Sequence, residues 1–139
     1  MLTQTTRYGF STAVAMPYEE AVERTRAELA REGFGVLTEI DVRATLKKKL
    51  DVDFRPYVIL GACNPPFAYK ALQAERDIGL LLPCNVVVYA ADEPGTSVVA
   101  AMDPEAALQL ADAAGIGEVA LEVKSRLERA LRRVAGEEA

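Results

Sequence analysis

Residues 84–102 read CNVVVYAADEPGTSVVAAM, and this stretch decides the fold class. Cys84 to Ala91 is rich in β-branched residues, which are typical of strands. The next four residues, 92–95, are Asp, Glu, Pro and Gly, which is the composition of a tight turn. Thr96 to Met102 is again apolar and β-branched. The stretch therefore predicts a β-hairpin, whose two strands run antiparallel.

Further strands are predicted upstream of this hairpin. Residues 8–15 alternate larger and smaller side chains, and Tyr57 to Ala62 is typical of a buried strand. The alternation of residues 34–43 is strict, and the residues on one side are Phe34, Val36, Thr38, Ile40 and Val42. Strict alternation predicts that one face of this strand is buried and that the other is largely in water.

Prolines, N-cap residues and glycines indicate helices between and after these strands. The expected ranges are 16–33, 44–50, 65–79, 103–115 and 118–134. No linker, repeat or low-complexity stretch divides the chain. We therefore predict a single domain over residues 1–139 with a two-layer α+β fold, in which helices pack on a largely antiparallel β-sheet.

The composition excludes several classes of function. The net charge is −5, which argues against nonspecific nucleic-acid binding because such binding needs a basic surface. The chain has no histidine, which excludes Ser-His-Asp and Cys-His catalysis and histidine-based zinc sites. No stretch approaches the roughly 20 apolar residues of a membrane span, and the first residues lack the apolar core of a signal peptide. We expect a cytoplasmic protein with reduced cysteines and no membrane association.

Two Cys-Asn pairs, Cys63-Asn64 and Cys84-Asn85, contain the only cysteines, and each pair adjoins a proline. If the helix between the pairs simply returns the chain, the two strands run parallel and the cysteines lie roughly 20 Å apart, given about 1.5 Å per helical residue. If residues 78–83 carry the chain back across the sheet, the strands run antiparallel and the thiols meet. The sequence leaves both arrangements open.

The chemistry of the two pairs also has alternatives. Cys63 follows a strand and precedes a helix, so the helix dipole would lower its thiol pKa, although Pro65 and Pro66 remove two N–H donors there. The alternative is a small buried apolar residue. If Cys63 and Cys84 meet, they would form a disulfide or a two-thiolate site for a soft ion such as Cu(I). The asparagines are expected to satisfy backbone groups in turns and caps, or to line a polar pocket.

Glu39 and Asp41 share one face of the strand predicted over residues 34–43. Paired carboxylates can hold a metal or share a proton. The alternative is a pair of surface charges that meets Arg43 or the lysines of residues 47–49.

Several of these segments resemble one known family. Residues 61–65, GACNP, and residues 81–89, LLPCNVVVY, are similar to the bacterial and archaeal domain-of-unknown-function family 302, and so are residues 39–42 and 47–50. The resemblance covers Tyr8 to Met102. It implies a compact α+β domain with no established activity, and it supplies no catalytic residue.

We conclude from the sequence that the protein is a non-catalytic small-ligand-binding or interaction domain, and that it is a homodimer. No catalytic residue, cofactor or metal is expected. The candidate ligand-binding residues are Cys63, Asn64, Cys84, Asn85, Glu39 and Asp41. The alternative is a thiol-dependent redox protein or a soft-metal-binding protein that uses Cys63 and Cys84.

Overall fold

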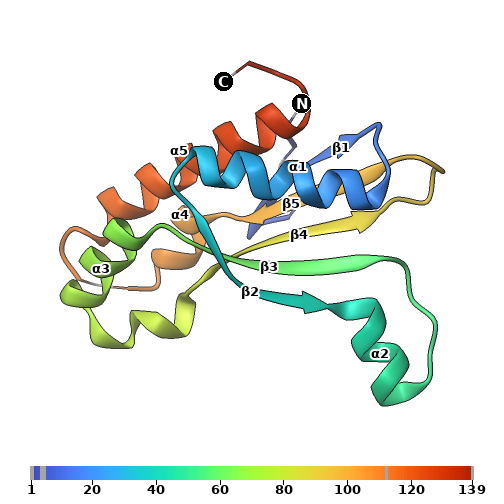
Figure 1. Ribbon diagram of the computed structural model, residues 1–139. Helices are drawn as coiled ribbons and strands as arrows, with labels where there is room; N and C mark the ends of the chain where they lie inside the picture. Colours follow the sequence, from blue (N-terminus) through green and yellow to red (C-terminus); the bar gives the residue numbers. More distant parts are fainter. Residues whose placement is uncertain (1, 4–5, 112, 139) are drawn as a thin grey trace.

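The computed structural model describes residues 2–3, 6–111 and 113–138. Within them, five strands form one antiparallel sheet in the order β1-β5-β4-β3-β2 (Figure 1). The strands are β1 (Gly9–Val14), β2 (Gly35–Asp41), β3 (Tyr57–Cys63), β4 (Cys84–Ala90) and β5 (Ser97–Met102). β4 and β5 form the hairpin that residues 84–102 predict. The predicted two-layer α+β fold with an antiparallel sheet is confirmed.

Helices α1 and α5 pack together over one face of the sheet (Figure 1). The helices are α1 (Tyr18–Arg31), α2 (Val42–Leu50), α3 (Pro65–Ala74), the 3-10 helix η1 (Arg76–Leu81), α4 (Pro104–Leu108) and α5 (Ile116–Val134). α5 buries apolar residues at helical spacing, among them Val123, Leu127 and Leu131, and this stripe faces the core. None of the helices described combines the length and apolarity needed to cross a membrane.

The core lies between these helices and the sheet. Alternate residues of the strands point into it, so that Val58, Leu60, Val86, Val88 and Val99 are at most 2% exposed. The neighbouring positions in each strand point to the other side. Helices α1 and α5 do not cover that side, which we call the open face, and α2 contacts β2 and β3 at its edge (Figure 1).

The strict alternation predicted for residues 34–43 is wrong. The register between β2 and β3 shifts between Val36 and Thr38, because Leu37 forms a bulge. A one-residue shift moves all later side chains to the opposite face. Val36 therefore shares the helix-covered side with Ala62, whereas Ile40 pairs with Ile59 and is 48% exposed. β2 is an edge strand, and none of its residues is buried.

Glu32, at the end of α1, anchors that helix to α5. Its carboxylate is 7% exposed, accepts hydrogen bonds from Arg129 at 2.8 and 3.1 Å, and accepts another from Arg133. Burial alone would raise the pKa of Glu32, but the two guanidinium groups outweigh burial and lower it. The ion pairs therefore hold Glu32 as a carboxylate between the two helices.

Candidate ligand-binding cavity

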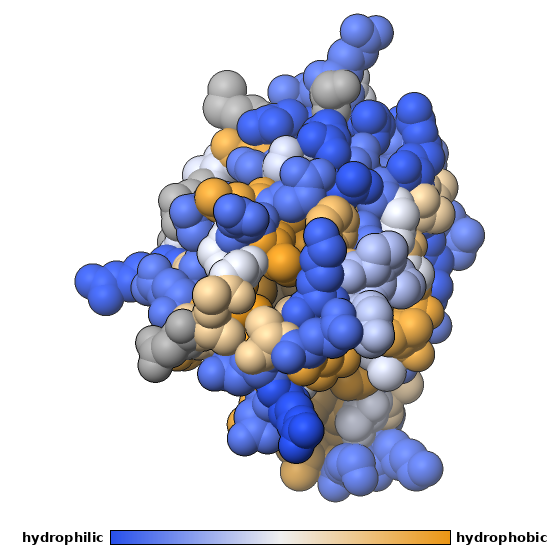
Figure 2. Space-filling model, turned by 90° about the vertical axis from the view of Figure 1, so that its left-hand side faces the viewer, coloured by the Kyte–Doolittle hydropathy of each residue, from blue (hydrophilic) through white to orange (hydrophobic). Residues whose placement is uncertain are grey.

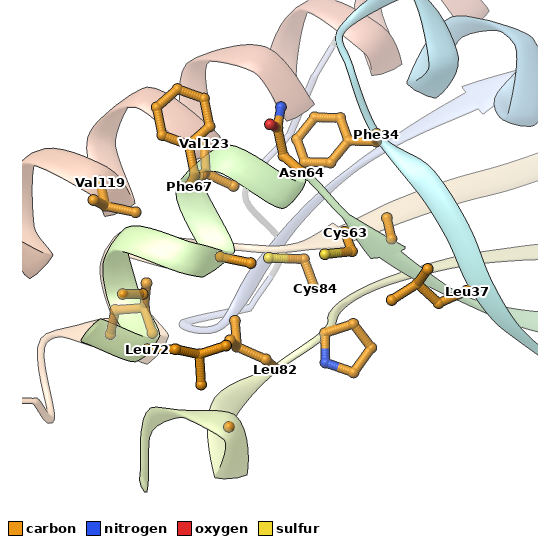
Figure 3. A pocket seen from close by; sticks show the side chains of 16 residues that line it. Phe34, Leu37, Cys63, Asn64, Phe67, Leu72, Leu82, Cys84, Val119 and Val123 are labelled. Atoms are coloured by element: carbon orange, nitrogen blue, oxygen red, sulfur yellow. The ribbon is translucent and has the colours of Figure 1, made fainter. Parts of the chain in front are cut away.

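An apolar cavity of about 280 Å³ lies at the end of the sheet that α3, η1 and α5 cover (Figure 3). Its lining includes Phe34, Phe67, Leu72, Leu82, Val119 and Val123. Figure 2 looks at the end of the molecule that carries α3, and it shows apolar side chains exposed within a hydrophilic surround. The lining is almost wholly carbon and sulfur, so the cavity offers apolar contact and few polar partners.

The local sequence builds this cavity in two steps. β3 ends at Cys63, and the prolines at 65 and 66 occupy the first turn of α3, where their missing N–H groups cost little. η1 then turns the chain, and β4 begins at Cys84 after a cis peptide bond between Leu82 and Pro83. β4 runs antiparallel to β3 with Cys84 opposite Ala62. Of the two arrangements that the sequence leaves open, the antiparallel one is found, and Cys63 and Cys84 line the same cavity.

Both cysteines are free thiols, and Figure 3 shows their sulfur atoms directed into the cavity. Burial raises the pKa of Cys63 above its usual value. Burial, with a smaller contribution from the neighbouring Cys63, raises the pKa of Cys84 to about 11. This direction is opposite to the lowering of the pKa that the helix dipole was expected to give Cys63. At neutral pH both groups are neutral thiols, which are weak nucleophiles.

Asn64 links two parts of the chain at the rim of the cavity. Its side chain is turned away from the thiols (Figure 3), and Nδ2 donates a hydrogen bond to the carbonyl oxygen of Glu32 at 3.1 Å. Arg126 donates to the same oxygen at 3.2 Å and lies 5.2 Å from the ring centre of Phe67. Asn64 occupies the N-cap position of α3, but it makes no side-chain cap. It satisfies a backbone carbonyl in the α1–β2 turn instead.

Asn85 lies on the other side of the sheet from Cys84. It is exposed on the open face, in a shallow groove of about 400 Å³ that is also lined by Tyr8, Tyr57 and Tyr89. Tyr57 and Tyr89 are cross-strand partners, and their rings stack with centres 5.2 Å apart. The two Cys-Asn pairs therefore do not form one site.

Glu39 and Asp41 lie on the helix-covered side at the β2 edge, away from the cavity. Glu39 forms an ion pair with Arg26 at 2.9 Å, and Asp41 accepts a hydrogen bond from the backbone N–H of Ala44 at 2.9 Å. Asp41 thus caps α2. Burial, helped by the nearby negative charges of Asp41 and Glu39, raises the pKa of Tyr18. Among the residues described, no three Cys, Asp or Glu side chains gather to hold a metal ion.

Sequence reasoning finds the two thiols and misses most of the lining. These residues are Phe34 just before β2, Leu37 in β2, Leu82 after η1, and Val119 and Val123 in α5. Nothing in their sequence context separates them from ordinary core residues. Phe67, Ala71 and Leu72 lie in α3, within the helix predicted over residues 65–79, and all three line the cavity.

Comparison with known proteins agrees with the motifs around the cavity. The sequence matches the family described as "Domain of unknown function DUF302" over residues 10–134. The chain belongs to the DUF302 family. A crystal structure of an uncharacterized conserved DUF302 protein from Bacillus stearothermophilus has 32% sequence identity to this DUF302 chain and a TM-score of 0.83. That similarity covers 93% of this chain and 99% of the other. No curated protein matches the sequence.

Proposed function

We propose that this DUF302 protein is a non-catalytic domain that binds a small apolar molecule in the cavity between α3, α5 and the ends of β3 and β4, and that it functions as a homodimer. The observation that carries the ligand proposal is the cavity itself, which is lined by carbon and by two neutral thiols. Its volume of about 280 Å³ is close to the lower end of the range for small-molecule sites, roughly 300–1,000 Å³.

The chemistry of the lining selects the ligand class. No charged residue lines the cavity among the residues described, so a ligand group carrying a formal charge would lose its hydration without compensation. Apolar and aromatic molecules lose no such hydration, and thiols and aromatic rings are polarisable partners for them. We therefore propose a neutral, largely hydrocarbon ligand of about the size of one or two aromatic rings.

The proposal is tested by titrating the protein with naphthalene and following backbone amide resonances by NMR. We expect saturable shifts at the non-proline residues of 62–72, 82–84 and 119–123. Ala68, which lines the cavity, is replaced by leucine to fill it, and the exposed Ala74 on the same helix provides a matched Ala→Leu control. Binding should weaken at least tenfold in Ala68→Leu and stay unchanged in Ala74→Leu. Equal binding by both variants would contradict the proposed site.

A thiol function is the second candidate, and one observation favours it: both thiols line one cavity. A soft ion such as Cu(I) would bind the two sulfurs after displacing their protons. This candidate predicts one equivalent of Cu(I) bound per chain and lost in Cys63→Ser. Failure of the native protein to take up Cu(I) under reducing conditions would exclude it.

A further inference from the structure

The open face of the sheet has an unusual composition for an exposed surface. Its central residues are Tyr57, Ile59, Val87, Tyr89, Val98 and Ala100. The structure describes all five strands completely, and none of their residues on this face is charged, in a chain of which 27% is charged. Charged residues are depleted in the cores of protein interfaces, and tyrosine is enriched there.

The exposed area of the chain is large for its mass. Folded monomers of 15.0 kDa expose roughly 7,000 Å² by the usual scaling with mass. This chain exposes 8108 Å², which is about 1,000 Å² more than that scaling gives. A standard interface covers about 800 Å² on each partner. The excess is therefore of the size that one protein interface would bury.

The dimensions of the open face suit such an interface. Five strands spaced about 4.8 Å apart, each about six residues long at 3.4 Å per residue, give a face of roughly 24 by 20 Å. Two such faces in contact would bury about 500 Å² on each chain, or about 1,000 Å² in total, which is the lower limit for a specific interface and about half of the excess area per chain. Exposed Ile40, Phe54 and Tyr8 extend the apolar area around the strands.

We infer that the open face is the homodimer interface, where two copies pack sheet against sheet in a four-layer assembly of helices, sheet, sheet and helices. A two-fold dimer brings each patch against its own copy, so a charge near the symmetry axis would meet a like charge. The open face carries none, although each chain has a net charge of −5. A partner that is recognised through complementary charges would find none on this face.

The inference rests on the proposed homodimer and is independent of ligand binding in the cavity, which lies at the end of the sheet beside α3, η1 and α5. The test is sedimentation equilibrium over a concentration series, with Val87→Lys at the centre of the open face. Val87 is part-exposed in the single chain, so lysine can extend into water without disturbing the core. The control is Leu121→Lys on α5, where Leu121 is 53% exposed and away from the sheet. Naphthalene binding in the cavity shows whether each variant is folded. If naphthalene does not bind the native protein, circular dichroism spectra of the variants provide this check.

We expect a native dimer, a dimer dissociation constant raised at least 100-fold in Val87→Lys by the paired like charges, and an unchanged constant in Leu121→Lys. A native protein that stays monomeric at all concentrations would overturn both the homodimer and this interface. A dimer that survives Val87→Lys would overturn the interface alone. A small molecule or a different protein found on the open face of a monomer would also overturn it.

Discussion

The side-chain amide of Asn64 donates a hydrogen bond to the carbonyl oxygen of Glu32 across 32 residues of sequence, at a distance of 3.1 Å. The bond joins the turn between α1 and β2 to the junction between β3 and α3. Asn64 is 7% exposed, so water cannot readily replace its amide. This contact fixes the position of the chain segment that carries Cys63 and the start of α3, and with it one wall of the cavity.

Asn64→Ala should lower the free energy of unfolding by about 1–2 kcal/mol, because it removes one of the two donors to a buried carbonyl. The remaining donor is Arg126. Urea denaturation followed by circular dichroism measures the loss. Asn85→Ala is the matched control, and it should change stability by less than about 0.5 kcal/mol because Asn85 is exposed. Equal effects at the two asparagines would contradict the role given to Asn64.

Glu32→Gln should lower stability at pH 7 by about 1–3 kcal/mol, because it weakens charged hydrogen bonds to Arg129 and Arg133. The pKa of Glu32 is lower in the folded protein than its usual value of 4.5. Its contribution is therefore fully present above about pH 4.5 and is lost as the pH falls through the lower folded pKa. Denaturation curves between pH 7 and pH 3 should show this loss in the native protein and a smaller one in Glu32→Gln. If the stability of the two proteins depended on pH in the same way, the role given to the Glu32 carboxylate would be contradicted.

Gly61→Ala should cost about 1–3 kcal/mol, which is typical of overpacking. A Cβ at this position would overlap the Thr38 hydroxyl and lie 2.9 Å from Cγ of Pro83. Gly35 in the neighbouring strand has no atom within 4 Å of its Cβ position and supplies the control. The two Gly→Ala variants are compared by thermal unfolding, and a Gly35→Ala variant as unstable as Gly61→Ala would show that backbone effects dominate.

The thiols should react slowly with iodoacetamide in the native protein. With a pKa of about 11, only about one Cys84 side chain in a thousand is a thiolate at pH 8. Cys84 should therefore react far more slowly than it does in urea, and Cys63, which is less buried, should react first. Mass spectrometry of peptides from timed samples gives both rates. Fast alkylation of Cys84 at pH 7 would support the redox alternative.

The fold was largely predictable because its signals are local. The turn of residues 92–95 and the β-branched residues around it are sufficient to indicate the β4–β5 hairpin. The bulge at Leu37 was not predictable. It arises from the pairing of β2 with β3, and the alternating sequence of residues 34–43 does not indicate where that pairing is irregular.

The candidate site was predictable only in part. The sequence singles out Cys63 and Cys84, but their meeting depends on how η1 returns the chain. The partner of Asn64 is 32 residues away and cannot be read locally. The separation of Cys84 from Asn85 could have been predicted, since adjacent residues of a strand point to opposite faces. The ligand-binding roles of all six candidate residues remain predictions.

The edge position of β2 has a consequence for motion. Neither β2 nor α2 contains a buried residue, and the segment that follows exposes Leu50, Val52 and Phe54. Such a region opens locally at a small fraction of the free energy that global unfolding requires. Its amide hydrogens should therefore exchange with solvent deuterium well before those of β4 and β5, which makes residues 42–52, outside the proposed interface, a place where a protease can cut.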